Sequence, residues 1–127
     1  MVPVTEVLSP WEYAARAFEP DAARRRWPTP GHLARYLDHR IVQTPALDLI
    51  DQALADLAAT PDGRLIITMA PQEGKSERVA KWFPLRQLIA NPDLRIITAS
   101  YGQSLANRNG RKIRNLIETH PELGLRI

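Results

Sequence analysis

The amino-acid sequence predicts an α/β fold, in which parallel strands with flanking helices follow a helical N-terminal region. Three observations predict it. Helix start signals recur between residues 9 and 45. Two short, apolar, β-branched runs come next, at residues 65–69 and 94–99. A helical pattern follows each run, and the order strand, helix, strand, helix favours right-handed crossovers within one parallel sheet.

Composition agrees with one small globular domain, because 44% of the 127 residues are hydrophobic and 24% are charged. The absence of cysteine excludes disulfides and thiolate metal sites, and His32, His39 and His120 do not have metal-ligand spacing. No apolar run approaches the roughly 20 residues that cross a bilayer. The first ten residues lack the pattern of a secretory signal. The net charge of +3 weakly favours an anionic partner.

Serine or threonine followed by proline stands directly before a helical pattern at Ser9-Pro10, Thr29-Pro30 and Thr44-Pro45. This pair predicts a helix N-cap with proline at the first helical position. The expected helices are a short one over 11–18, one from Pro30 to about Arg40, and one that starts at Pro45. Between the first two, Arg24-Arg25-Arg26-Trp27 is expected to be a solvated connection, with a DNA or subunit contact as the alternative.

The helix that starts at Pro45 carries apolar residues at spacings of three and four, which predicts one apolar stripe against the core. Its apolar positions are Leu47, Ile50, Leu54 and Leu57, and its acidic positions, expected off the stripe, are Asp48, Asp51 and Asp56. The turn signal of residues 60–63 ends it.

The run Leu65–Met69 predicts a strand that is buried on both faces, as in a parallel sheet. A helix is expected from Ser76 to about Ala90, with Pro84 kinking or splitting it. The run 94–99 predicts a second strand. The last helix is expected over 103–119, with its apolar side made of Leu105, Ile113, Leu116 and Ile117.

The segment Ala70–Ser76 lies between a predicted buried strand and a predicted helix, which is where a phosphate-binding loop is found. A helix start offers unpaired N–H groups to phosphate, and Gly74 allows the backbone to come close. The amine of Lys75 would reach the terminal phosphates, and the Ser76 hydroxyl would be a ligand of Mg²⁺. Met69 stands where the standard pattern has its first glycine. The competing interpretation is a turn that only caps a helix.

The Glu73 carboxylate would be repelled by a triphosphate, so only its backbone N–H is expected to face the ligand. The residues predicted to bind nucleotide in and after the loop are Pro71, Gln72, Glu73, Gly74, Lys75, Ser76 and Glu77.

The run Arg64–Glu77 resembles the phosphate loop of the large terminase subunits of tailed phages, a family that often replaces the first glycine and places proline before the loop. The resemblance covers about Thr44 to Glu118. It continues through Phe83-Pro84, Asn91-Pro92-Asp93, residues 96–101, Leu105-Ala106 and residues 110–114. It implies a P-loop NTPase core of the RecA-like, additional-strand type. The implied activity is ATP hydrolysis that drives double-stranded DNA into a prohead.

The resemblance also implies roles for single residues. Lys75 would be the phosphate-binding, catalytic lysine, and Ser76 would hold Mg²⁺ through ATP. The family uses a glutamine upstream of the loop near the adenine, for which Gln52 is preferred over Gln43. Since Gln72 and Glu73 fill the places where such loops often carry arginine, Arg78 or an arginine of a neighbouring subunit would supply that charge. The implied partners are double-stranded DNA, the portal protein, the small terminase subunit and further copies in a ring, in the host cytoplasm.

Residues 1–43 are expected to form the helical N-terminal region, and residues 44–127 an incomplete P-loop ATPase domain with only its Walker A half. No apolar strand ending in paired acids follows the second predicted strand, so the chain is expected to bind nucleotide without turnover. The alternatives are another P-loop NTPase, such as a helicase or small kinase, and a non-enzymatic basic DNA-binding module. Expected DNA contacts lie on the last helix at Arg108, Arg111, Lys112 and Arg114, for which a solvated face is the plainer interpretation.

Overall fold

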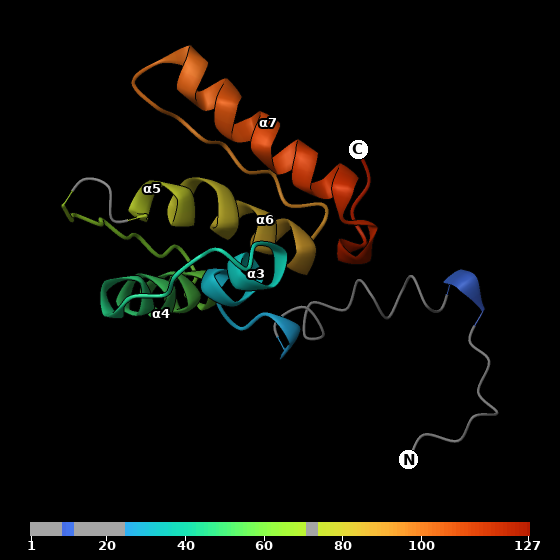
Figure 1. Cartoon of the computed structure of the whole chain (residues 1–127), viewed down its shortest axis with the longest axis horizontal. Helices are drawn as coiled ribbons and strands as arrows, with labels where there is room; N and C mark the ends of the chain where they lie inside the picture. The colour runs from blue at the N-terminus through green and yellow to red at the C-terminus, as the bar shows by residue number, and fades with distance from the viewer. Residues whose placement is uncertain (1–8, 12–24, 71–73) are drawn as a thin grey trace.

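The computed structural model describes residues 9–11, 25–70 and 74–127, and this part of the chain is helical (Figure 1). No β-strand occurs within these residues. The predicted α/β fold with a partial P-loop core of parallel strands is therefore wrong. The elements are α3 (Pro30–Leu37), α4 (Pro45–Ala59), α5 (Lys75–Glu77), the π-helical η1 (Arg78–Trp82), α6 (Phe83–Ala90), α7 (Gln103–Thr119) and the 3-10 turn η2 (Pro121–Leu123).

The two threonine-proline pairs predicted to start helices, Thr29-Pro30 and Thr44-Pro45, do so. The Thr29 hydroxyl accepts a hydrogen bond from the His32 N–H at 3.4 Å, and the Thr44 hydroxyl accepts one from the Leu47 N–H at 3.2 Å. These contacts satisfy N–H groups that have no partner inside the helix. The last helix spans Gln103–Thr119, as expected. Of the helix expected over 11–18, only Trp11 lies within the described residues.

The two runs predicted as strands, 65–69 and 94–99, form no ladder with each other or with another described segment. In Figure 1 they run on opposite sides of the helices α5 and α6. A strand exists only where a neighbouring strand takes up its backbone N–H and C=O groups, and neither run has such a neighbour in the described part. The burial on both faces that was expected of Leu65–Met69 is also wrong, since Ile66 is 90% exposed. In the second run, Ile97 is 94% exposed.

The break expected at Pro84 takes the form of a local widening. α5, η1 and α6 follow one another without interruption from Lys75 to Ala90. In the wide turn, the N–H of Phe83 donates to the carbonyl of Arg78, five residues earlier. Pro84 has no N–H to offer a preceding carbonyl, and the π-helical turn directly before it accommodates that loss.

Two hydrophobic clusters hold the helices together. The larger joins Trp27 and α3 to α6, and α7 packs against it through Ile113, Leu116 and Ile117. It combines residues from both sides of the boundary expected at 43/44. The smaller consists of Leu47, Ile50 and Leu54 on α4, against which Val79, Phe83, Ile67 and Met69 pack. The helical run Lys75–Ala90 contributes to both clusters, so its position is fixed from two sides.

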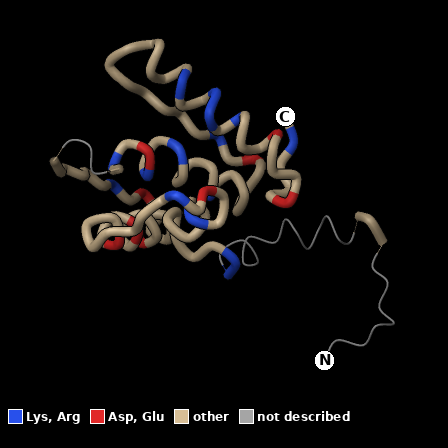
Figure 2. Tube along the Cα trace, viewed as in Figure 1, with Lys and Arg blue, Asp and Glu red and all other residues tan. Residues whose placement is uncertain are grey.

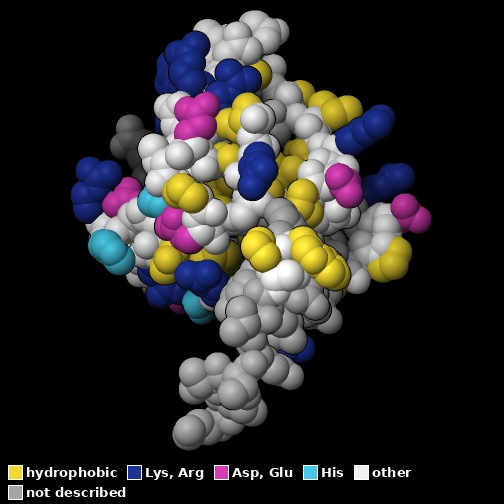
Figure 3. Space-filling view, turned by 90° about the vertical axis from the view of Figure 1, so that its right-hand side faces the viewer, with side chains coloured by type: hydrophobic (Ala, Val, Ile, Leu, Met, Phe, Trp, Pro, Cys, Tyr) yellow, Lys and Arg dark blue, Asp and Glu magenta, His cyan; other side chains and the backbone are white. Residues whose placement is uncertain are grey.

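Trp27 belongs to the core and not to a solvated connection, since it is 4% exposed. The buried side chain of Arg86 on α6 donates to the carbonyls of Trp27 and Pro28 at 2.8 and 2.9 Å. The Arg26 guanidinium lies 4.6 Å from the centre of the Trp27 ring. These contacts fasten the chain before α3 to α6. Elsewhere, apolar side chains reach the surface between charged ones (Figure 3).

Candidate functional site

A hollow of about 550 Å³ lies between the α3–α4 connection and the start of the helical run Lys75–Ala90. Its volume is within the range of small-molecule sites. One wall comes from Asp38, Ile41, Val42, Thr44 and Leu47, and the other from Gly74, Glu77, Arg78, Lys81 and Trp82. The lining therefore combines apolar side chains with charges of both signs.

Gly74 stands where the hollow meets the helix start. Its backbone is left-handed, with φ of 80° and ψ of 2°, a conformation that glycine adopts without the strain that a Cβ would add. Its carbonyl accepts the first hydrogen bond of the helix, from the N–H of Arg78 at 3.1 Å. The sequence-predicted residues Pro71, Gln72 and Glu73 lie outside the described residues.

Lys75 and Ser76 form the first turn. The Lys75 amine donates to the carbonyl of Met69 at 3.5 Å, which is the long end of the hydrogen-bond range, so little holds it there. Lys75 does not line the hollow, whereas Gly74 directly before it does. The Ser76 side chain is exposed, and its hydroxyl has no partner among the described residues. Both groups are available to a ligand at the helix start.

Glu77 joins the first turn of the helical run to α7. Its carboxylate pairs with the Lys112 amine at 2.6 Å and with the Lys81 amine at 2.5 Å. Burial raises the pKa of Glu77, but the hydrogen bonds from Lys112 and Lys81 outweigh burial and leave its pKa below the ordinary value. The carboxylate is therefore ionised at neutral pH and holds two cations.

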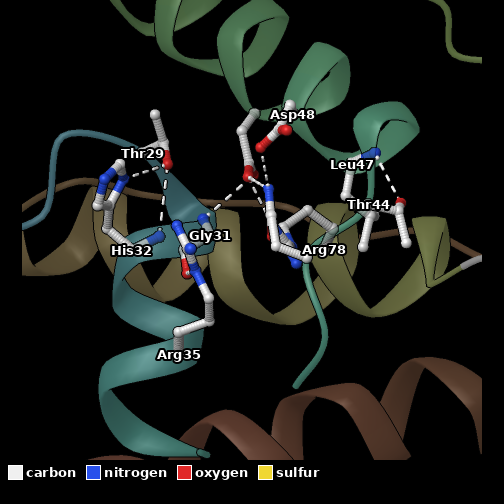
Figure 4. Close-up of polar contacts among 10 residues, drawn as sticks. Thr29, Gly31, His32, Arg35, Thr44, Leu47, Asp48 and Arg78 are labelled. Atoms are coloured by element: carbon white, nitrogen blue, oxygen red, sulfur yellow. Dashed lines mark hydrogen bonds and ion pairs between the residues drawn. The ribbon is translucent and has the colours of Figure 1, made fainter.

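Arg78, which lines the hollow, belongs to a buried polar network (Figure 4). Arg78 donates to the Asp51 carboxylate at 2.5 Å, and Asp51 also accepts from the N–H of Gly31 at 3.1 Å and from the Gln43 amide at 2.8 Å. Asp51 and Arg78 are 3% and 2% exposed. The expectation that Asp51 lies off the buried stripe is therefore wrong. Arg78 is therefore paired with Asp51 and is not free to supply the positive charge that the resemblance implied for the loop.

Sequence reasoning missed Asp51, although a signal was present. Asp51 follows Leu47 by four residues and precedes Leu54 by three, so it lies on the same helix face as both. An acid in that position needs a buried cation, and the arginine in the first turns of the next helix is one.

The two glutamines lie elsewhere than expected. Gln52 is exposed and donates to Asp56 at 3.0 Å on the same helix. Gln43 donates to Asp48 at 2.7 Å and accepts from Arg78 at 3.1 Å, so it belongs to the buried network. Neither side chain lines the hollow.

The basic residues of α7 separate into two kinds. Arg108, Arg111 and Arg114 are exposed and have no ion-pair partner among the described residues. Lys112 is instead tied to Glu77. The structure thus brings one of the four expected DNA contacts to the helix start and leaves three facing solvent.

No protein-family model, curated protein or solved structure matches this chain. Among the described helices, none combines the length and the apolar character needed to span a membrane.

Proposed function

We propose that this chain binds a nucleoside triphosphate, with the phosphates at the helix start formed by Gly74, Lys75 and Ser76 and the nucleoside in the adjoining hollow. The observation that carries the proposal is the hollow itself, whose wall includes Gly74, the N-cap of the helical run. The proposal depends on this helix start and not on a sheet.

Three features favour phosphate at this end. The first N–H groups of the unbroken run Lys75–Ala90 have no partners within the helix, and the helix dipole makes this end positive. The loosely held amine of Lys75 adds a full positive charge. The hydroxyl of Ser76 is a suitable ligand for a Mg²⁺ ion carried by the phosphates.

The rest of the hollow suits an uncharged, flat group. Ile41, Val42, Leu47 and Trp82 supply apolar surface for a base. The charged groups that line it, Asp38, Glu77, Arg78 and Lys81, each already have an ion-pair partner, so none of them is left for phosphate. The nucleoside therefore belongs there, and the phosphates belong toward Gly74.

The resemblance to large terminase subunits supplies the biological setting of this proposal. The chain would be the ATP-binding part of a phage DNA-packaging motor that works with double-stranded DNA, the portal protein and the small terminase subunit. ATP and Mg²⁺ are the ligands to test first.

Titration of the chain with a fluorescent ATP analogue and Mg²⁺ tests the proposal. Lys75→Ala is expected to weaken binding about 10- to 100-fold, since a charge-assisted contact to phosphate is lost. Val42→Asp places a third carboxylate at the hollow. It should weaken the binding of the nucleotide more than the binding of inorganic triphosphate. Val42 is 75% exposed, so this change should not disturb folding.

The matched control is Arg95→Ala, which removes one exposed positive charge outside the site. It should bind the analogue as the wild type does. Saturable binding that Lys75→Ala leaves unchanged would overturn the proposal, as would the absence of binding by the folded wild-type chain.

A further inference from the structure

We infer that the outward face of α7, carried by Arg108, Arg111 and Arg114, is a docking surface for the phosphate backbone of double-stranded DNA. The inference rests on the proposed function for its partner and on α7 itself for its location. It assigns a surface that nucleotide binding at Gly74 leaves unexplained.

The three arginines form a stripe that winds across the outer side of the helix, since a spacing of three residues turns each by about 60° relative to the one before. They recur every three residues, opposite the apolar side of Ile113, Leu116 and Ile117 that packs on the core. At about 1.5 Å per residue, the stripe extends about 9 Å along the axis. Phosphates of one DNA strand follow each other at about 3.4 Å along the duplex axis, so the stripe matches a short series of them.

The positive charge of this face is not neutralised within the described residues. Arg40 and Arg78 each pair with an aspartate, whereas the three arginines of α7 have no such partner. Figure 2 shows basic positions along α7 and an acidic one only near its C-terminal end. That acid is Glu118, in the last turn. Such a face attracts a polyanion over its full length.

A hollow on this face provides a place for a phosphate. It measures about 370 Å³ and is lined by Ala106, Asn107, Gly110, Arg111 and Arg114. A Cβ on Gly110 would meet nothing within 4 Å, so packing does not require glycine here. Glycine within a helix is about 1 kcal/mol less favourable than alanine. Its missing side chain leaves room for a close approach between two guanidinium groups and an amide.

Duplex DNA fits the face better than a single strand. Single-strand sites combine positive charge with aromatic side chains on which bases stack, and α7 carries no aromatic residue. The exposed amides of Asn107 and Asn115 lie among the arginines. Arginine and amide side chains contact both phosphates and base edges of a duplex.

Fluorescence polarisation of the whole chain with a labelled 20-base-pair duplex, without nucleotide and over a series of salt concentrations, tests the inference. The triple variant R108A/R111A/R114A is expected to bind at least tenfold more weakly at low salt. The slope of log K against log salt should fall by about 2 to 3, since each lost phosphate contact removes about 0.9.

The control triple variant R64A/R95A/R126A removes the same charge from exposed arginines outside α7. It should keep most of the affinity and the slope. Equal losses in the two triple variants would overturn the inference, because they would show that only net charge matters. Equal or tighter binding to a single strand, or to anionic vesicles through the same arginines, would also overturn it.

Failure here is distinguishable from failure of the proposed function. R108A/R111A/R114A should bind the ATP analogue like the wild type, and Lys75→Ala should bind duplex DNA like the wild type. If the chain binds nucleotide but not DNA, only the inference of a docking surface is overturned.

Discussion

Two aspartate–arginine pairs in this chain have the same chemistry in opposite surroundings. Asp38 and Arg40 lie two residues apart on the surface, with their closest atoms 3.0 Å apart and the arginine side chain 91% exposed. Asp51 and Arg78 lie far apart in sequence, and their side chains are 4% and 3% exposed. The first pair connects two residues of the same turn, whereas the second connects α4 to the helical run Lys75–Ala90.

The difference indicates that the buried pair, and not the exposed one, holds the candidate site in place. Water and salt screen the surface pair, so its atoms gain little from being paired. In the buried pair, each partner would be left as an isolated charge without the other, which a protein interior does not tolerate. Since Arg78 follows Lys75 by three residues, the buried pair also fixes the helix start.

The largest expected effect is that of Asp51→Ala. It leaves the Arg78 guanidinium buried without a counter-charge and should lower the free energy of unfolding by about 3–5 kcal/mol, measured by urea denaturation. The double variant D51L/R78M removes both charges and should recover most of the loss. A double variant as unstable as the single one would show that the charge pair is not the cause.

The matched control for that substitution is Asp38→Ala, which removes the same group from the exposed pair. Its urea midpoint should coincide with that of the wild type. A large loss in this control would contradict the view that burial, and not pairing as such, makes the Asp51–Arg78 contact important.

A smaller loss is expected from Gly31→Ala. A Cβ at this position would collide with the Asp51 carboxylate and the Arg78 guanidinium, so the network must shift or break. The free energy of unfolding should fall by about 1–3 kcal/mol, as for other overpacked positions.

The same substitution at Gly110 is the control, because a Cβ there meets nothing within 4 Å. Gly110→Ala should raise the free energy of unfolding by about 1 kcal/mol through helix propensity. If both glycine variants shifted thermal melts in the same direction, close contact at Gly31 would not be the deciding factor.

The smallest expected effect concerns the half-exposed contacts of Glu77, which lie between the two pairs in burial. Because its pKa is lowered in the folded chain, its ion pairs stabilise above the ordinary glutamate pKa of about 4.3 and are lost as pH falls through the folded value. Wild type should therefore melt slightly above Glu77→Gln at pH 7, by less than about 1 kcal/mol in free energy.

The gap should close as the pH of the melts is lowered to about 3, below the ordinary glutamate range. Glu118→Gln removes an exposed acid and should show no such pH-dependent gap. A gap between wild type and Glu77→Gln of the same size at both pH values would contradict the role of the ionised carboxylate.

The sequence predicted the helices well because their signals are local. Thr29-Pro30 and Thr44-Pro45 carry the cap and the first helical residue side by side, and the apolar spacing of α7 lies within one segment. The strands were wrong because strand formation depends on a partner. Leu65–Met69 has the same pattern whether or not a neighbour takes up its backbone groups, and the described chain provides none.

The candidate site was predictable in part. Gly74, Lys75 and Ser76 predict a helix start, which the structure has, and Gly74 lines the hollow beside it. The opposite wall could not be predicted, since Ile41 and Val42 approach Gly74 only after α3 and α4 have packed on the helical run. The Asp51–Arg78 pair has the same origin, because its two members lie 27 residues apart.

The π-helical turn at Arg78–Trp82 determines which way the Lys75 ammonium faces. A wide turn contains one residue more than a regular path would need, and each residue of an α-helix adds about 100° of rotation. The first helical residues, Lys75–Glu77, are thus rotated about the helix axis by more than a quarter of a circle relative to the face that buries Leu85 and Ile89. A chain with one residue deleted from it could keep the same hydrophobic interior and aim its ammonium elsewhere.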